Sequence, residues 1–373
     1  MKKSILAAVI DQWSVVPPVE TADLSGKTVL VVGANVGIGF EASKHFARMQ
    51  PARLIIACRN EAKGKAALAG MYDRLKLNGY KGCEFWIVDL ANFASVTAFA
   101  DKFKREGGDL HILVMNAAIL QLVYQPTADG WESLLVYFTF SAHCYGSYPP
   151  FRLQVNYLAT SLLSLLLIPQ LVAAGRKSST PSRLVIVSSD LHYWVTPAKE
   201  VKASTTPLET LSNEEWCIPE HMRSRHNESK LLNILFVRAL TDRLQSITPL
   251  SAVAVNPGYC YSQLRRDWYK KPTFSSARIA VAFHECLLVW TAEQGSRQLV
   301  FAAVGGRDNE DNMKAGYVNL GRLIEVADFV LSDEGRKFQN TVWNETIDIL
   351  NGVSDKIAPI VQGYLVVPNS SIN

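Results

Sequence analysis

Short runs of apolar residues recur along the chain, and most are followed by a segment with the spacing of an amphipathic helix. The runs are rich in Val, Ile and Leu, which is typical of strands buried on both faces of a parallel sheet. We predict strands at 27–32, 54–57, 85–88, 112–115, 183–187, 251–255 and 316–320. We predict helices at 41–49, 61–77, 95–104, 153–172, 229–244 and 335–350. This alternation predicts an α/β fold with a parallel sheet covered on both faces.

The sequence contains no linker that would separate two such units. We therefore expect one α/β domain at 25–330, an N-terminal extension at 1–24, and a C-terminal helix and tail at 331–373. The extension begins with a short apolar run that Asp11 interrupts, too short for a signal peptide, and we expect a short amphipathic helix there. No run reaches the roughly 18 apolar residues of a membrane span.

The composition is that of a globular protein, with 48% hydrophobic and 19% charged residues. The formal net charge of +4 gives no reason to expect nucleic acid as a partner. The six cysteines include no C-x-x-C pair, which argues against a structural zinc site. Their wide spacing is typical of free thiols in a reducing compartment, so we expect a cytoplasmic protein.

A glycine and five polar residues follow the ends of the predicted strands. They are Gly33, Arg59, Asp89, Asn116, Ser189 and Asn256. In open α/β sheets the ligand crevice lies at the carboxyl ends of the strands, so these positions indicate the site.

A glycine-rich turn, with Gly33, Gly37 and Gly39, joins the first strand to the first helix. Glycine lets a ligand approach the backbone closely, and a helix N-terminus offers free N–H groups to a pyrophosphate. The spacing differs from the G-x-G-x-x-G fingerprint, and a tight turn with no ligand is the alternative interpretation.

Arg59 follows the second strand, where a dinucleotide fold places an acid for the NAD ribose or an arginine for the NADP 2′-phosphate. No acid occurs at this strand end, and Lys63 lies one turn further on. The pattern therefore favours NADP (NADPH) over NAD, with a helix-entry surface role for Arg59 as the alternative.

Between Ser25 and Ala303 the chain resembles the short-chain dehydrogenase/reductase family, especially its retinol-dehydrogenase-like and fungal metabolic members. Six motifs occur in the family's order: the glycine turn, Asp89-Leu90, Met115-Asn116-Ala117-Ala118, Gln154-Val155-Asn156, Val187-Ser188-Ser189 and Asn256-Pro257-Gly258. The resemblance implies a Rossmann-type doubly wound parallel sheet in a single domain. It also implies a nucleotide-binding oxidoreductase that acts by hydride transfer, with a place in secondary metabolism.

The resemblance implies two sets of site residues. The cofactor-binding set is Gly33, Asn35, Gly37, Ile38, Gly39, Arg59, Asp89, Leu90, Asn116, Lys230, Pro257 and Gly258. The catalytic set is Asn156, Ser189, His226 and Lys230. In the family the serine orients the substrate oxygen, and a tyrosine in a Tyr-x-x-x-Lys segment gives or takes the hydroxyl proton.

His226 stands where the family has that tyrosine, four residues before Lys230. This spacing places both on one face of a helix, so Lys230 would lower the pKa of His226. Three interpretations remain. His226 carries the proton, or Tyr193 or Tyr259 replaces it, or the chain binds cofactor as a redox-neutral or regulatory protein without redox turnover.

The substrate is expected to be a small hydrophobic alcohol, aldehyde or ketone. The stretch after Gly258 forms part of the substrate pocket in relatives, and here it is aromatic: Tyr259, Cys260, Tyr261, Leu264 and Trp268. The alternative is that these side chains only fill the core. The resemblance also implies a homo-oligomer packed through long helices.

The segment 133–152 is an atypical insertion, rich in aromatic residues and nearly free of charge. Both of its junctions fall inside an otherwise continuous family motif, between Trp131-Glu132 and Gln154. It is either an aromatic lid or contact surface, or the translation of a retained intron. Two other classes of enzyme lack their motifs in this sequence. It contains no H-E-x-x-H spacing, which a metal hydrolase would have, and no G-x-S-x-G elbow, which a serine hydrolase would have.

Overall fold

The computed structural model describes residues 3–75, 80–118, 129, 153–213, 215–222, 224–245, 247–261 and 288–366. These residues form an eight-stranded sheet in the order β3-β2-β1-β4-β5-β6-β7-β8. The strands are β1 (Thr28–Val32), β2 (Arg53–Cys58), β3 (Cys83–Ile87), β4 (Ile112–Met115), β5 (Ser182–Val187), β6 (Leu250–Val255), β7 (Tyr317–Asn319) and β8 (Arg322–Ile324). All neighbours pair in parallel except β7 and β8, which pair antiparallel.

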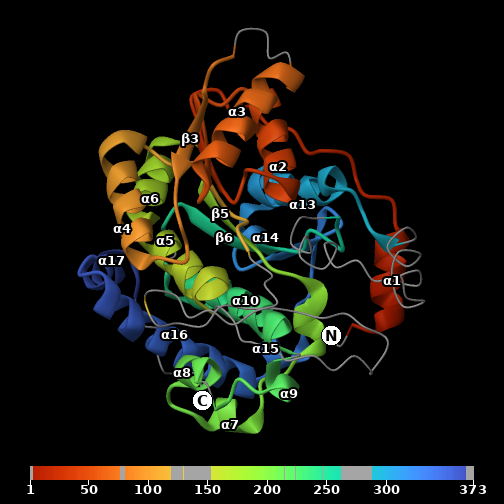
Figure 1. Cartoon of the computed structure of the whole chain (residues 1–373), viewed down its shortest axis with the longest axis vertical. Helices are drawn as coiled ribbons and strands as arrows, with labels where there is room; N and C mark the ends of the chain where they lie inside the picture. The colour runs from red at the N-terminus through yellow and green to blue at the C-terminus, as the bar shows by residue number, and fades with distance from the viewer. Residues whose placement is uncertain are drawn as a thin grey trace.

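Helices cover both faces of this sheet (Figure 1). One face carries α2 (Gly37–Arg48), α3 (Glu61–Leu75) and α13 (Ala292–Val304). The other carries α4 (Phe93–Lys102), α5 (Ala159–Leu166), α6 (Ile168–Lys177), α10 (Arg225–Arg243), α16 (Asp333–Val353) and α17 (Ile357–Tyr364). Shorter helices are α1 (Ile5–Trp13), α7 (Lys199–Ala203), α8 (Pro207–Ser212), α9 (Pro219–Met222), α14 (Glu310–Met313) and α15 (Asp328–Leu331), with the 3₁₀ turns η3 (Asp190–Trp194) and η5 (Arg307–Asn309).

The alternation of side chains along each strand divides the core between the two faces. In β1, Val29 and Val31 pack into one cluster with Phe46 of α2. Leu30 and Val32 pack into the other, which includes Trp343 of α16. Because strands of this kind are buried on both faces, their sequences read as continuous apolar runs. The predicted doubly wound parallel sheet in a single domain is confirmed.

The helix predicted at 153–172 is not continuous. It begins with a π-helical segment, η2 (Gln154–Leu158), continues as α5, and bends at Leu167 before α6. Pro169 lies in the first turn of α6, where its missing N–H costs least, so a new helix starts there. A second π-helical segment, η1 (Phe103–Gly107), extends α4. The strand β8 has no counterpart among the predicted elements, because its three residues are partly exposed and show no apolar run.

The N-terminal extension contains the expected short helix, α1, which Ser4 caps by accepting the N–H of Ala7. Asp11, which interrupts the apolar run of the sequence, lies inside this helix. Its carboxylate accepts hydrogen bonds from Lys3 and Asn319, which offset the cost of removing the charge partly from water.

Among the described residues no single helix is long and apolar enough to cross a membrane. One bent pair, Gln154–Leu166 with Ile168–Lys177, passes that test together, with a bend of 47°. Every residue of its first part, 154–166, is buried in the core of the molecule, whereas Arg176 and Lys177 at the end of the second part are exposed. The insertion at 133–152 and the residues Leu264 and Trp268 lie outside the described residues.

Candidate active site

The turn after β1 binds the ends of both neighbouring strands. The N–H of Gly33 donates to the carbonyl of Ala57 at 2.7 Å. Asn116, just past β4, donates its side-chain amide to the carbonyl of Gly33 at 2.9 Å. Asn116 therefore fixes the glycine turn, which is a sufficient physical reason for an asparagine at this strand end.

Two of the three glycines in this turn are required by close contacts. A Cβ on Gly33 would lie 2.6 Å from the Cα of Ala117, and one on Gly39 would lie 2.4 Å from the carbonyl oxygen of Gly33. Gly37 differs: it has a φ of +64°, and a Cβ there would meet nothing within 4 Å. The backbone at Gly37 thus faces open space at the start of α2.

The N-terminus of α2 has the chemistry of an anion site. Its first turn contains no acidic residue, and Val36 at its N-cap provides no side-chain hydrogen bond. Its first N–H groups and the positive end of its dipole are therefore available to a pyrophosphate. Asn35 and Ile38 border this turn and are half-buried. These features fit a dinucleotide, which the glycine turn, Asn35, Ile38 and Asn116 would hold.

The ends of β2 and β3 place three further predicted residues at the same sheet edge. Arg59 follows β2 and is exposed, while Asn60 caps α3 by accepting the N–H of Lys63 at 2.9 Å. Asp89 follows β3 and accepts the N–H of Ala91 at 3.0 Å. Leu90 beside it is buried in the core.

Asn156 lies inside the π-helical segment η2 and is buried. π-helical turns interrupt the regular hydrogen-bond ladder and are frequent at functional sites. Asp129 supports this segment from outside: its carboxylate accepts from the side chain of Gln154 at 2.7 Å and from the N–H of Phe93 at 2.9 Å. The segment is therefore held against the start of α4.

The two serines at the end of β5 have different roles. The hydroxyl of Ser188 is buried and donates to the carbonyl of Lys230 at 2.7 Å, which holds α10 against the end of β5. Ser189 is half-buried, and its hydroxyl accepts the N–H of Leu191 at 3.3 Å. That contact leaves the Ser189 proton available for donation, so of the two serines Ser189 is the one able to bind a substrate oxygen.

His226 and Lys230 lie one turn apart at the start of α10. Lys230 is buried, and its ammonium donates to the carbonyl of Val187 at 3.0 Å. Burial lowers the pKa of Lys230 to about 8. His226 is half-buried, and its carbonyl accepts the hydroxyl of Ser229 at 2.8 Å. The i, i+4 spacing thus places His226 on the side of α10 that faces the end of β5.

Tyr193 is one of the two tyrosines that could replace His226 as proton carrier, but its hydroxyl is already bound elsewhere. Its hydroxyl donates to the backbone carbonyl of Glu325, and burial raises its pKa. The neighbouring His192 binds the carbonyl of Ser189 at 2.8 Å through Nδ1 and the N–H of Ala327 at 3.2 Å through Nε2. Burial lowers the pKa of His192 to about 4, so it is neutral and holds the backbone.

The turn after β6 is held on both sides. Asn256 donates its amide to Asn319 at 3.1 Å and accepts the N–H of Gly258 at 3.1 Å. Gly258 has a φ of +79°, and a Cβ there would lie 2.3 Å from the ring of Trp290. Pro257 is buried, and its carbonyl accepts the thiol of Cys260 at 3.0 Å. Glycine is thus required at position 258 by both backbone and packing.

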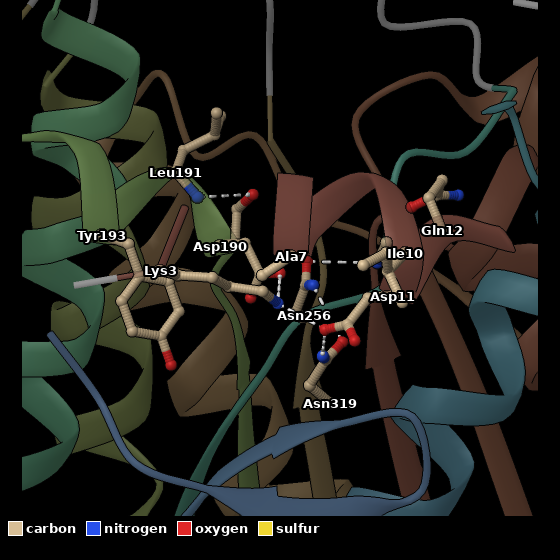
Figure 2. A network of polar contacts seen from close by, with 12 residues as sticks. Lys3, Ala7, Ile10, Asp11, Gln12, Asp190, Leu191, Tyr193, Asn256 and Asn319 are labelled. Carbon is tan, nitrogen blue, oxygen red and sulfur yellow. Dashed lines mark hydrogen bonds and ion pairs between the residues drawn. The ribbon is translucent and has the colours of Figure 1, made fainter. Parts of the chain in front are cut away.

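The N-terminal helix also belongs to this edge of the sheet, which the sequence analysis does not indicate. Lys3 contacts Asp190 in the turn after β5, and Asp11 contacts Asn319 at the end of β7 (Figure 2). Gln12 contacts Tyr259 in the turn after β6. The only indication in the sequence is the polar pair Asp11-Gln12 next to an apolar run. The same pattern is typical of the exposed surface of any amphipathic helix.

The chain is similar to proteins of one family. The model of the short chain dehydrogenase family matches residues 27–192. Short chain dehydrogenase sol3 of Alternaria solani is 35% identical over 287 residues, which cover 77% of this chain and 88% of that protein. The WW domain-containing oxidoreductase of Gallus gallus is 37% identical over 254 residues, which cover 66% of this chain and 52% of that protein.

Solved structures are similar in fold. The short chain dehydrogenase from Shigella flexneri matches with a TM-score of 0.51 and 17% identity, over 83% of this chain and 98% of that chain. The KRED1-Pglu enzyme matches with a TM-score of 0.51 and 14% identity, over 78% of this chain and 100% of that chain.

Proposed function

Because the chain belongs to the short-chain dehydrogenase/reductase family, we propose that it interconverts a small apolar alcohol and its aldehyde or ketone with NADP(H). The observation that carries the proposal is the attachment of α10 to the end of β5. Ser188 and Lys230 make that attachment through two hydrogen bonds, 2.7 and 3.0 Å long. It brings Ser189, His226 and Lys230 to the sheet edge that also carries the glycine turn.

A nicotinamide bound at this edge would supply the hydride acceptor or donor. Ser189 donates a hydrogen bond from its hydroxyl to the substrate oxygen and orients it. His226 gives that oxygen a proton in reduction and takes one in oxidation, which is general acid–base catalysis. The Lys230 ammonium binds ribose hydroxyls. Asn156 in the π-helical segment is the fourth residue of the proposed catalytic set.

Three features support NADP as the cofactor. Arg59 is exposed at the end of β2, no acidic residue stands at that strand end, and Lys63 follows within one turn. A guanidinium pairs with a phosphate through two parallel hydrogen bonds, whereas the ribose of NAD needs an acceptor. Pro257 and Gly258 would border the nicotinamide side.

A cofactor-binding protein without redox turnover is the second candidate. The observation in its favour is His226, because an imidazole is shorter than a phenol. Tyr193 also favours this candidate, because its hydroxyl already donates to the backbone carbonyl of Glu325 and is not available to replace the missing tyrosine.

The deciding experiment measures NADPH and NADH oxidation with a panel of apolar aldehydes and ketones. We expect turnover by the native protein, and a loss of about 10²–10⁴-fold in kcat in His226→Phe, which keeps a ring but has no group that can give or take a proton. His226→Tyr is expected to retain turnover with a changed pH profile. Arg59→Ala is expected to weaken NADPH binding and leave NADH binding nearly unchanged.

The outcomes separate the two candidates. If the native protein binds NADPH without turnover and His226→Tyr gains activity, the redox-neutral candidate replaces the first. If neither cofactor binds, both are wrong.

We further propose a cytoplasmic location and a homo-oligomer. The location is supported by Cys58, Cys83, Cys217 and Cys260, which are free cysteines within the described part of the chain. We also propose a place in secondary metabolism, which rests on the resemblance to the fungal metabolic members of the family.

A further inference from the structure

Lys3 is a buried cation between two carboxylates. Only 4% of its side chain is exposed, and its ammonium binds Asp11 at 2.5 Å and also Asp190 (Figure 2). Its backbone carbonyl accepts the indole N–H of Trp194 at 2.8 Å. Asp190 and Trp194 are the first and last residues of η3, so the N-terminal segment holds both ends of this turn.

The turn η3 in turn determines the position of Ser189. Ser189 is its N-cap and accepts the N–H of Leu191 on its hydroxyl oxygen at 3.3 Å. Its carbonyl accepts the ring nitrogen of His192 at 2.8 Å. Tyr317 of β7 holds the other oxygen of Asp190 at 2.7 Å, so the Asp190 carboxylate is bound from two sides.

The helix α1, which follows Lys3, binds the turn after β6 at the same edge of the sheet. The side chain of Gln12 accepts the N–H of Tyr259 and donates to its carbonyl, both at 3.0 Å. The backbone carbonyl of Gln12 accepts the indole N–H of Trp290 at 2.7 Å. Asp11 reaches Asn256 through Asn319, with hydrogen bonds of 2.9 and 3.1 Å. Residues 3–13 therefore bridge the turns after β5 and β6.

We propose that residues 3–13 are a structural part of the active site and that Lys3 is a positioning residue, which fixes the hydroxyl of Ser189 through Asp190. Lys3 does not touch the reacting atoms. Its charge lets Asp11 and Asp190 lie side by side, and without it two partly buried carboxylates would repel each other. The role of Ser189 in turnover rests on the proposed function; the fixing of its turn does not.

Three variants test this proposal. Lys3→Met removes the charge and keeps the length of the side chain, and Lys3→Arg restores the charge. Glu310→Gln is the matched control, because it weakens the buried pair between Arg183 and Glu310, 2.6 Å long, at the opposite end of the same strand β5. Asp190→Asn repeats the test from the other partner, should Lys3→Met fail to fold.

Hydrogen exchange of the amides of Leu191 and His192, both bound to Ser189, provides the readout that does not depend on turnover. We expect Lys3→Met to speed this exchange by about tenfold or more and to leave the glycine turn unchanged. We expect kcat to fall by about tenfold or more, with less than about a twofold change in NADPH affinity, since small misplacements of a catalytic group are costly. Lys3→Arg should restore kcat.

A melting temperature lowered in both Lys3→Met and Glu310→Gln, with kcat and the η3 exchange unchanged in both, would show that Lys3 is only structural and overturn the proposal. If the native protein has no turnover, the proposed function fails, and the exchange of Leu191 and His192 still decides whether Lys3 fixes this turn.

Discussion

Lys230 shows how burial alone sets the chemistry of a residue in this site. Its ammonium is removed from water and bound to the carbonyl of Val187 at 3.0 Å. Burial lowers its pKa from 10.5 to about 8. Lys230 is therefore fully protonated well below pH 8 and loses its charge as the pH rises through about 8.

The affinity for NADPH should follow that titration. We expect the dissociation constant to be flat below about pH 7 and to rise above about pH 8, because a neutral amine binds the cofactor less well than an ammonium. Lys230→Met should bind more weakly at low pH and lose this step. A fluorescence titration of NADPH between about pH 6 and 10 measures both. A step that persists in Lys230→Met would assign the titration to another group.

The residues of the site could be predicted from the sequence only where a local motif carries them. The glycine turn, Asp89, Asn116, Ser189, Lys230 and Asn256 follow strands or begin helices, and the structure brings them to one edge of the sheet. Their roles in binding and catalysis stay predictions. Lys3 could not be found in this way, because its partner Asp190 lies 187 positions away and only the fold brings the two together.

At the scale of the secondary structure elements, Gly39 of α2 and Gly70 of α3 differ in what an added side chain would contact. Gly39 is helical, yet a Cβ there would lie 2.4 Å from both the side chain of Asn116 and the carbonyl of Gly33. Gly70 is also helical, and a Cβ there would meet nothing within 4 Å. Helix propensity favours alanine at both positions, and packing forbids it at one.

We therefore expect the same substitution to change stability with opposite signs. Gly70→Ala should raise the free energy of unfolding by about 1 kcal/mol. Gly39→Ala should lower it by about 1–3 kcal/mol, because the backbone of the turn must shift, and should weaken NADPH binding as well. Urea denaturation and an NADPH titration measure these effects. A Gly39→Ala protein as stable as the native one, with native NADPH affinity, would contradict the tight packing of this turn.

The elements themselves follow from the sequence to different extents. The buried parallel strands are continuous apolar runs, and the strand predicted at 112–115 has the observed bounds of β4. The bend at Leu167 and the π-helical segment around Asn156 are not visible in the periodicity, because both change the backbone without changing the apolar pattern. β8 depends on pairing with β7, which three partly exposed residues do not indicate.

At the scale of the whole molecule, segments from both ends of the chain pack on the central sheet. The N-terminal segment binds the turn after β5 through Lys3 and Asp190. In α16, Trp343 stacks on Phe236 of α10 with ring centroids 5.8 Å apart, and Thr346 contacts the hydroxyl of Tyr157 at 2.9 Å. The division into 1–24, 25–330 and 331–373 stays a prediction, and these contacts favour treating the three parts as one folding unit.

The two apolar cores lie on opposite faces of the sheet and share its strands, so they should unfold together. Trp343 and Phe46, exposed by 4% and 0%, belong to the two different cores. We expect Trp343→Ala and Phe46→Ala each to lower the free energy of unfolding by about 3–5 kcal/mol. Because the residues share no partners, the double variant should lose the sum of the two within about 0.5 kcal/mol.

Guanidinium denaturation, followed by tryptophan fluorescence and by far-UV circular dichroism, measures this coupling. A single transition that coincides for both probes in each variant is expected, because neither layer of helices can keep its core once the shared strands separate. The opposite result would be two separated transitions, of which Trp343→Ala lowers the midpoint of the first and Phe46→Ala does not. It would mean that the helices of one face unfold while the sheet and the other face persist. In that case α16 would be an independently stable layer rather than part of the unit that holds the site.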